Sequence, residues 1–65
     1  MATEVTIRIN GVAFVRNPYN EGSVANLLVH KGVDPEIAQA VEEQCRLTAP
    51  GHKVPVKLSG IIITT

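Results

Sequence analysis

Residues 4–16 have the alternating pattern of a β-hairpin. The first half places apolar side chains at every second position and polar ones between them, which is typical of a strand with one covered face. The dipeptide Asn10-Gly11 then supplies the positive φ angles that a type I′ turn needs at both central positions. A two-residue turn puts Ile7 opposite Phe14 across the hairpin. The segment therefore predicts two antiparallel strands joined by a tight turn.

A short helix is predicted after a loop. Residues 17–22 read NPYNEG, a composition that is typical of loops. Ser23 can cap the N-terminus of a helix over residues 24–31, and Gly32 stands where helices commonly end. The apolar stripe of this helix consists of Val24, Leu27 and Leu28, with Ala25 beside it.

A second helix is predicted from Asp34-Pro35, where a capping residue precedes a proline in the first turn. The pattern extends this helix to about Arg46 or Leu47. Glu42 and Arg46 form an i,i+4 pair that we place on the solvent side. One face is apolar because its residues are spaced by four: Ile37, Val41 and Cys45, with Ala38 and Ala40 nearby.

The C-terminal end is the most apolar part of the chain. Residues 54–58 alternate, and Pro55 confines them to a sheet edge or to the start of a strand. The alternation shifts at Ser59-Gly60, which is either a β-bulge within one strand or a tight turn between two. Residues 61–63 are three isoleucines in succession, the pattern of a strand buried on both faces.

These segments together predict an α+β fold in the order ββααβ(β). The sheet would contain the N-terminal hairpin and the C-terminal strand or strands, with the two helices on one face. A length of 65 residues allows one domain, residues 1–65. Such a short chain buries only about 60% of the surface of its unfolded state, so its stability is marginal. Cys45 is the sole cysteine, so neither a disulfide nor a multi-cysteine metal cluster can add to this stability.

Charge and aromatic content argue against several classes of partner. Six basic residues balance six acidic ones, so the chain lacks the basic surface that nucleic acids and acidic membranes attract. Phe14 and Tyr19 are too few for stacking bases. No apolar run has the length of a transmembrane helix, and the first residues do not resemble a secretory signal. We therefore expect a cytoplasmic protein that binds neither nucleic acid nor membrane, which the single cysteine also favours.

The order of motifs from Ile7 to Val41 resembles a known family. An alternating strand, an Asn-Gly turn and a second strand precede Glu21-Gly22-Ser23-Val24, and a Gly-Val-Asp-Pro-Glu helix start follows from Gly32. This arrangement resembles the N-terminal part of the ubiquitin-like β-grasp sulfur carriers of thiamine and molybdopterin synthesis. The resemblance implies a β-grasp-like topology, in which the first and last strands lie parallel at the sheet centre.

The C-terminus departs from that family. Sulfur carriers end in Gly-Gly, whose carboxylate is adenylated and converted to a thiocarboxylate, whereas this chain ends Ile63-Thr64-Thr65. A β-branched pair cannot thread the narrow channel of an activating enzyme as two glycines do, so the sulfur-transfer chemistry does not carry over. The family's central segment is also missing, and the second predicted helix takes its place.

Candidate catalytic and metal-binding groups have simpler structural explanations. Cys45 could act as a nucleophile with His30 or His52 as base, but its place on an apolar helix face favours a packed, unreactive thiol. These three residues also lack the paired short spacings of a zinc site. Helix capping and solvation account for the acidic residues Asp34, Glu36, Glu42 and Glu43. We therefore expect no enzyme activity, no cofactor and no metal.

The function that remains is binding. Tyr19 lies on a proline-fixed loop, where an exposed tyrosine can be a binding hot spot or can cover the end of the core. The candidate protein-binding residues are Tyr19, Asn17, Asn20, Arg8 and Arg16. The first hypothesis is an adaptor or inhibitor of another protein, of a length typical of phage-encoded proteins. The alternatives are a degenerate β-grasp carrier without its chemistry and an oligomer that binds a small molecule between subunits.

The sequence also favours a homodimer. The core is small, an open sheet has two edges, and residues 12–15 carry no charge to protect an edge. Residues 61–63 need cover on both faces, whereas two short helices cover one. A partner could stack a second sheet or extend the first by edge pairing. The alternative is a monomer whose second face is covered by the loop 17–22.

Overall fold

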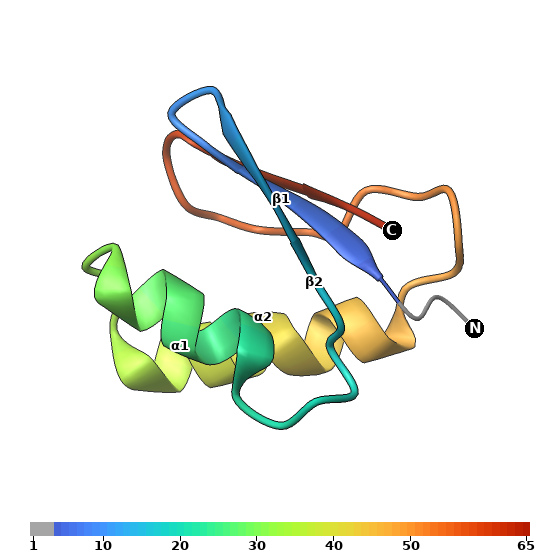
Figure 1. Cartoon of the computed structure of the whole chain (residues 1–65), viewed down its shortest axis with the longest axis horizontal. Helices are drawn as coiled ribbons and strands as arrows, with labels where there is room; N and C mark the ends of the chain where they lie inside the picture. The colour runs from blue at the N-terminus through green and yellow to red at the C-terminus, as the bar shows by residue number, and fades with distance from the viewer. Residues whose placement is uncertain (1–3) are drawn as a thin grey trace.

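The chain folds as one antiparallel sheet packed on two helices (Figure 1). The computed structural model describes residues 4–65. Both helices lie on the same side of the sheet, which confirms the predicted α+β class and the order ββααβ. The elements in chain order are β1 (Val5–Ile9), β2 (Val12–Arg16), α1 (Ser23–His30), α2 (Pro35–Leu47) and β3 (Ile61–Thr64).

The hairpin of β1 and β2 has the predicted register. Ile7 pairs with Phe14 and Ile9 with Val12, so two residues form the turn. Asn10 has a φ of 50° and Gly11 a φ of 85°. Positive values at both central positions are those of a type I′ turn, whose twist matches the twist of paired strands.

β1 is the central strand, and its pairing with β3 differs from the expectation. The sheet order is β2-β1-β3, and β3 runs antiparallel to β1, not parallel to it as the β-grasp resemblance implies. The reason is the path of the chain. The backbone N–H of Asn10 donates to the carbonyl of Gly60 at 3.0 Å, so the chain enters β3 beside the hairpin turn and runs back along β1.

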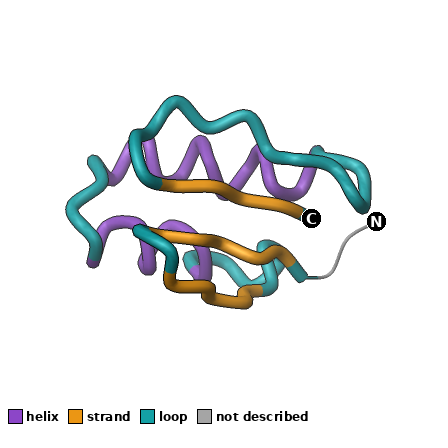
Figure 2. Tube along the Cα trace, turned by 90° about the horizontal axis from the view of Figure 1, so that it is seen from above, coloured by secondary structure: helices purple, strands orange, loops and turns teal. Residues whose placement is uncertain are grey.

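The segment before β3 is a loop that lies along the outer edge of β3. Residues 54–58 do not form the strand that their alternation predicts. Ser59-Gly60 is a turn between this loop and β3, so it is neither a bulge within one strand nor a turn between two. The N–H of Val54 donates to the carbonyl of Ile63 at 2.8 Å. Figure 2 shows this loop outside β3, on the side away from β1.

The expected burial of β3 on both faces is wrong. Ile63 is buried, but Ile62 is 51% exposed because it points to the uncovered face of the sheet. The helices cover only the other face, where the buried residues of the core gather: Val5, Ile7, Ile9, Val24, Ala25, Leu28, Ala38, Val41, Cys45, Val54 and Ile63. The uncovered face carries Arg8, Ala13 and Val15 beside Ile62, and these three are exposed.

The buried face of α2 is rotated slightly from the predicted one. Asp34 caps the helix as expected, since its side chain accepts the N–H of Glu36 at 3.0 Å. Ile37 is 47% exposed, whereas Ala38 is fully buried and begins the true stripe. α1 spans Ser23–His30, one residue earlier at each end than predicted. Within residues 4–65 neither helix combines the length and apolar content needed to cross a bilayer.

Replacing Gly11 by valine should destabilise the fold through backbone strain alone. A side chain at this position meets no atom within 4 Å, so crowding plays no part. The φ of 85° is costly for a β-branched residue, and we expect a loss of about 1–2 kcal/mol or more in the free energy of unfolding. Urea denaturation measures it. Gly11→Asn is the matched control, because asparagine tolerates positive φ, and equal stability of both variants would contradict the turn.

Candidate functional site

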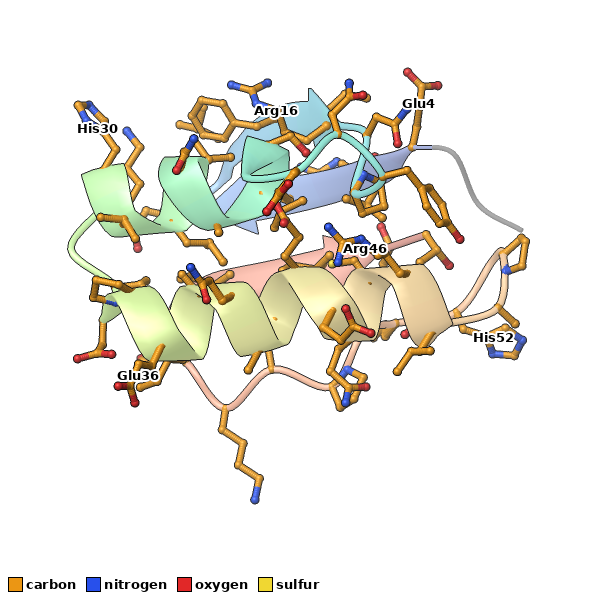
Figure 3. The ribbon with its side chains drawn as sticks, turned by 90° about the horizontal axis from the view of Figure 1, so that it is seen from below. Glu4, Arg16, His30, Glu36, Arg46 and His52 are labelled. Carbon is orange, nitrogen blue, oxygen red and sulfur yellow. The ribbon has the colours of Figure 1, made fainter. Side chains whose placement is uncertain are left out.

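A polar hollow lies where the two helices meet the loop 17–22. Its volume is about 610 Å³, and Figure 3 shows Arg46 between the two helices in this region. The lining residues come from the loop and from both helices: Tyr19, Glu21, Gly22, Ala25, Asn26, Gln39, Glu42, Glu43 and Arg46. Polar side chains from the loop and both helices converge here.

The carboxylate of Glu42 forms the inner wall of the hollow and caps α1. Its two oxygens accept backbone N–H groups from Gly22 at 3.0 Å, Val24 at 2.8 Å and Ala25 at 3.0 Å. The first N–H groups of a helix have no partner within the helix, and a negative charge there also favours the helix dipole. A residue of α2 therefore completes the N-terminus of α1.

This arrangement corrects two expectations. Glu42 does not lie on the solvent side of α2: it is 5% exposed, and it is the one charged residue among the buried side chains of residues 4–65. Ser23 does not cap α1 either, because Gly22 holds the cap position and no side chain in that position bonds to the helix. The Ser23 hydroxyl donates instead to the carbonyl of Asn17, which ties the loop to the helix start.

Arg46 holds Glu42 and the loop together. Its guanidinium donates to Glu42 at 3.1 Å and to Glu43 at 2.9 Å, and its Nε donates to the carbonyl of Pro18 at 2.7 Å. Pro18 is itself almost fully buried. The predicted i,i+4 pair of Glu42 and Arg46 is therefore present, but it faces inward and joins α2 to the loop.

The environment of Glu42 keeps it ionised. Burial raises the pKa of its carboxyl, but hydrogen bonds from the backbone of Ala25, Gly22 and Val24, together with the charge of Arg46, outweigh that effect. The net result is a pKa below the ordinary value. Ionised Glu42 is thus a fixed structural charge, with every oxygen bonded.

Tyr19 stands at the rim of the hollow. Its hydroxyl donates to the carbonyl of Arg46 at 3.3 Å, and its side chain is 39% exposed. The side chain of Asn17 accepts the N–H of Tyr19 at 2.9 Å, which shapes the loop. Asn20 is exposed at the outer side of the same loop. Tyr19 is therefore tied to the C-terminal end of α2 by its hydroxyl while its side chain remains partly exposed.

The two arginines proposed with Tyr19 lie elsewhere. Arg8 is exposed in the middle of the uncovered sheet face. Arg16 ends β2, where its guanidinium donates to the carbonyl of Val15 at 2.8 Å and lies 5.8 Å from the ring centre of Phe14. The hollow thus gathers Tyr19 but neither arginine, and two of its charged residues, Glu42 and Glu43, were assigned by sequence to capping and solvation.

The groups considered for catalysis do not come together. Cys45 is 1% exposed, and burial, aided by the charge of Glu42, raises the pKa of its thiol to about 11. His30 and His52 lie at opposite ends of the molecule (Figure 3). Residues 4–65 contain no cluster of three or more His, Cys, Asp or Glu side chains suited to a metal ion.

The charges of the hollow favour a cation over an anion. Glu21, Glu42 and Glu43 line it against the single positive charge of Arg46, and Glu21 and Glu43 are exposed, whereas Glu42 is buried and bonded. The guanidinium of Arg46 is already bonded to two carboxylates and one carbonyl, so it has little capacity left for an anion. The exposed ring of Tyr19 adds a surface on which a cation can lie.

No protein-family model matches this chain, and neither a curated protein nor a solved structure is similar to it.

Replacing Glu42 by glutamine should remove about 2 kcal/mol from the free energy of unfolding, because hydrogen bonds to a charged group are lost inside the fold. Thermal and urea denaturation at pH 7 measure the loss. The matched control is Glu43→Gln, which removes the neighbouring carboxylate with a side-chain exposure of 57% and should cost under about 0.5 kcal/mol.

The difference in stability between the natural protein and Glu42→Gln should depend on pH. Because the pKa of Glu42 is lowered on folding, its contribution is complete above the ordinary value of 4.5 and is lost as the pH falls through the lower folded value. The stability difference between the natural protein and Glu42→Gln should therefore shrink as the pH falls below the ordinary value of 4.5. A difference that stays constant or grows on acidification would contradict the ionised cap.

Cys45 should react slowly with thiol reagents in the folded state. The thiolate is the reactive form, and a pKa of about 11 with 1% exposure leaves little of it accessible at pH 8. Labelling by Ellman's reagent should be slow without urea and fast with it. Cys45→Ala should cost about 1–2 kcal/mol in stability through lost packing. Rapid labelling of the native protein would show that the thiol is not buried.

Proposed function

We propose that this chain is a small non-enzymatic module that binds another protein, and that the hollow receives a lysine or arginine side chain of that partner. The observation that carries the proposal is the combination of two exposed carboxylates, Glu21 and Glu43, with an engaged arginine and an exposed tyrosine ring around one concavity. Carboxylates and an aromatic face together form a site suited to a basic side chain.

The rigidity of the hollow supports this role. Tyr19 is anchored by its hydroxyl and by the buried Pro18, so its ring is held in place before any partner binds. Arg46 links the loop to α2, and Glu42 links α2 to α1. A preformed surface loses less conformational entropy on binding than a mobile one, which leaves more of the contact energy for affinity.

Binding without catalysis is also the simplest account of the titratable groups. The Cys45 thiol is buried, and Glu42, the carboxylate whose charge raises the pKa of that thiol, is occupied by its hydrogen bonds. An adaptor and an inhibitor, including one encoded by a phage, would use the same kind of surface, and the identity of the partner distinguishes them. We propose the cytoplasm as the compartment, since a free cysteine suits reducing conditions. No specific observation favours the carrier alternative.

The test uses acetylated tetralysine and tetraglutamate peptides as probes in NMR titrations of the labelled protein. Tetralysine should shift amide signals of the hollow, and tetraglutamate should not. Tyr19→Ala should weaken the tetralysine affinity about two- to fivefold, because a cation–aromatic contact is worth about 0.5–1 kcal/mol. Glu21→Gln should weaken it as well, since Glu21 lines the hollow.

Glu36→Gln is the matched control, because it removes one exposed acidic charge at the far end of α2 (Figure 3). Its tetralysine affinity should equal that of the natural protein. Equal weakening by Glu36→Gln and Glu21→Gln would mean that only overall charge matters. Shifts spread over the surface, or none at all, would overturn the site.

A further inference from the structure

The two edges of the sheet are not equally protected. The outer edge of β3 is covered by the preceding loop: Lys53 forms a bridge with Thr64, and the N–H of Thr65 donates to His52 at 3.0 Å. β2 is the other edge strand, and Figure 2 shows it at the outer side of the sheet with β1 as its neighbour. An edge with unpaired backbone groups is a template for a further strand.

The backbone groups free for such pairing can be assigned from the hairpin register. Partners in an antiparallel pair alternate between bonded and non-bonded positions. A two-residue turn makes Ile9 and Val12 a bonded pair, so Val12, Phe14 and Arg16 direct their backbone groups toward β1. Ala13 and Val15 therefore direct their N–H and C=O groups away from the sheet.

Ala13 and Val15 of one copy can pair with Val15 and Ala13 of a second copy that is related to it by a two-fold axis. With the axis at Phe14, Ala13 of one copy faces Val15 of the other, and the reverse holds at the same time. That register pairs all of β2 with its symmetry mate and allows four backbone hydrogen bonds. Phe14 faces Phe14 of the second copy, and Arg16 faces Val12.

The position of Arg8 favours edge pairing over stacking of two sheets. Arg8 is exposed in the centre of the uncovered face, between Ala13 of β2 and Ile62 of β3. Face-to-face stacking about a two-fold axis would bury an unpaired arginine from each copy, which is costly. Edge pairing leaves both in water, three strand spacings or about 14 Å apart, where salt screens their repulsion.

From these observations we propose that the protein forms a homodimer in which the β2 edges of two copies pair antiparallel, giving a continuous six-stranded sheet. The uncovered face then runs across both copies and joins Ala13 and Val15, which is 52% exposed, to their counterparts. None of the residues that line the hollow belongs to β2, so the dimer and the binding of a basic side chain are independent.

Arg16 limits the strength of this pairing. Its guanidinium donates to the carbonyl of Val15, one of the acceptors that the second copy needs. The partner's Ala13 N–H replaces this contact when the dimer forms. Arg16 thus competes with the second strand for the Val15 carbonyl, and its removal strengthens the dimer.

Sedimentation equilibrium of three variants over micromolar to millimolar concentration tests the interface. Ala13→Pro removes one outward N–H and leaves the bonds to β1, because proline is tolerated on the outer side of an edge strand. It should raise the dimer dissociation constant at least tenfold. Ile62→Glu places a charge on the uncovered face beside Arg8 and should leave the constant within about twofold. Arg16→Ala should lower it severalfold.

Amide hydrogen exchange of the unaltered protein gives a readout that needs no variant. The amides of Ala13 and Val15 should be protected at millimolar concentration and lose that protection on dilution, whereas the amide of Phe14, bonded within the hairpin, should change little. A monomer at all concentrations would overturn the proposal. A dimer lost in Ile62→Glu but kept in Ala13→Pro would overturn it in favour of stacked sheets.

Discussion

The fold depends on one buried carboxylate that joins elements distant in sequence. α1 has eight residues, too few to be stable alone in water, and no side chain in its own cap position satisfies its first N–H groups. Glu42 of α2 supplies that cap from outside. Because Arg46 holds Glu42 and also bonds the loop at Pro18, the two helices and the loop form one hydrogen-bonded unit. The helices cover one face of the sheet, so the burial of that face depends on the two helices and the loop remaining joined.

The hollow is a by-product of the same arrangement. A helix capped by a residue of its neighbour must keep a short gap between the two helices at the capping end, and polar groups line this gap because backbone N–H groups point into it. The residues that stabilise the helix pair therefore also create the charged concavity. Stability and binding share side chains here, because Glu42 and Arg46 both join the helix pair to the loop and line the hollow.

Local patterns in the sequence were sufficient to predict the helices and strands, but not to predict which residues of one element contact another. The hairpin, its turn and its register follow from alternation and from Asn10-Gly11, since these are decided by neighbouring residues. The role of Glu42 was missed because spacing by four selected Ile37, Val41 and Cys45 as the buried stripe. The true stripe is Ala38, Val41, Glu42 and Cys45, with the usual steps of three and four. A glutamate inside such a stripe signals a buried partner, but that partner lies in another helix.

The direction of β3 could not be obtained from composition either. Three isoleucines predict a strand, but their burial depends on which face the helices cover and on how residues 54–58 approach the sheet. The antiparallel pairing with β1 is set by the contact between Gly60 and Asn10, residues from opposite parts of the chain. Long-range contacts of this kind are decided by the whole chain, whereas alternation reports only on a strand's immediate surroundings.

The central position of β1 has a consequence for synthesis on the ribosome. β1 is made first, but one of its two neighbours, β3, is the last element of the chain. While the nascent chain grows, β1 can pair with β2 and α1 can pack on α2. One edge of β1 stays unpaired until β3 is made, because Ile7 lacks its neighbour Ile63. Pairing between distant segments is slow because the intervening chain must first be ordered. The pairing of β3 is therefore the step that protects the second edge of β1 from pairing with other chains.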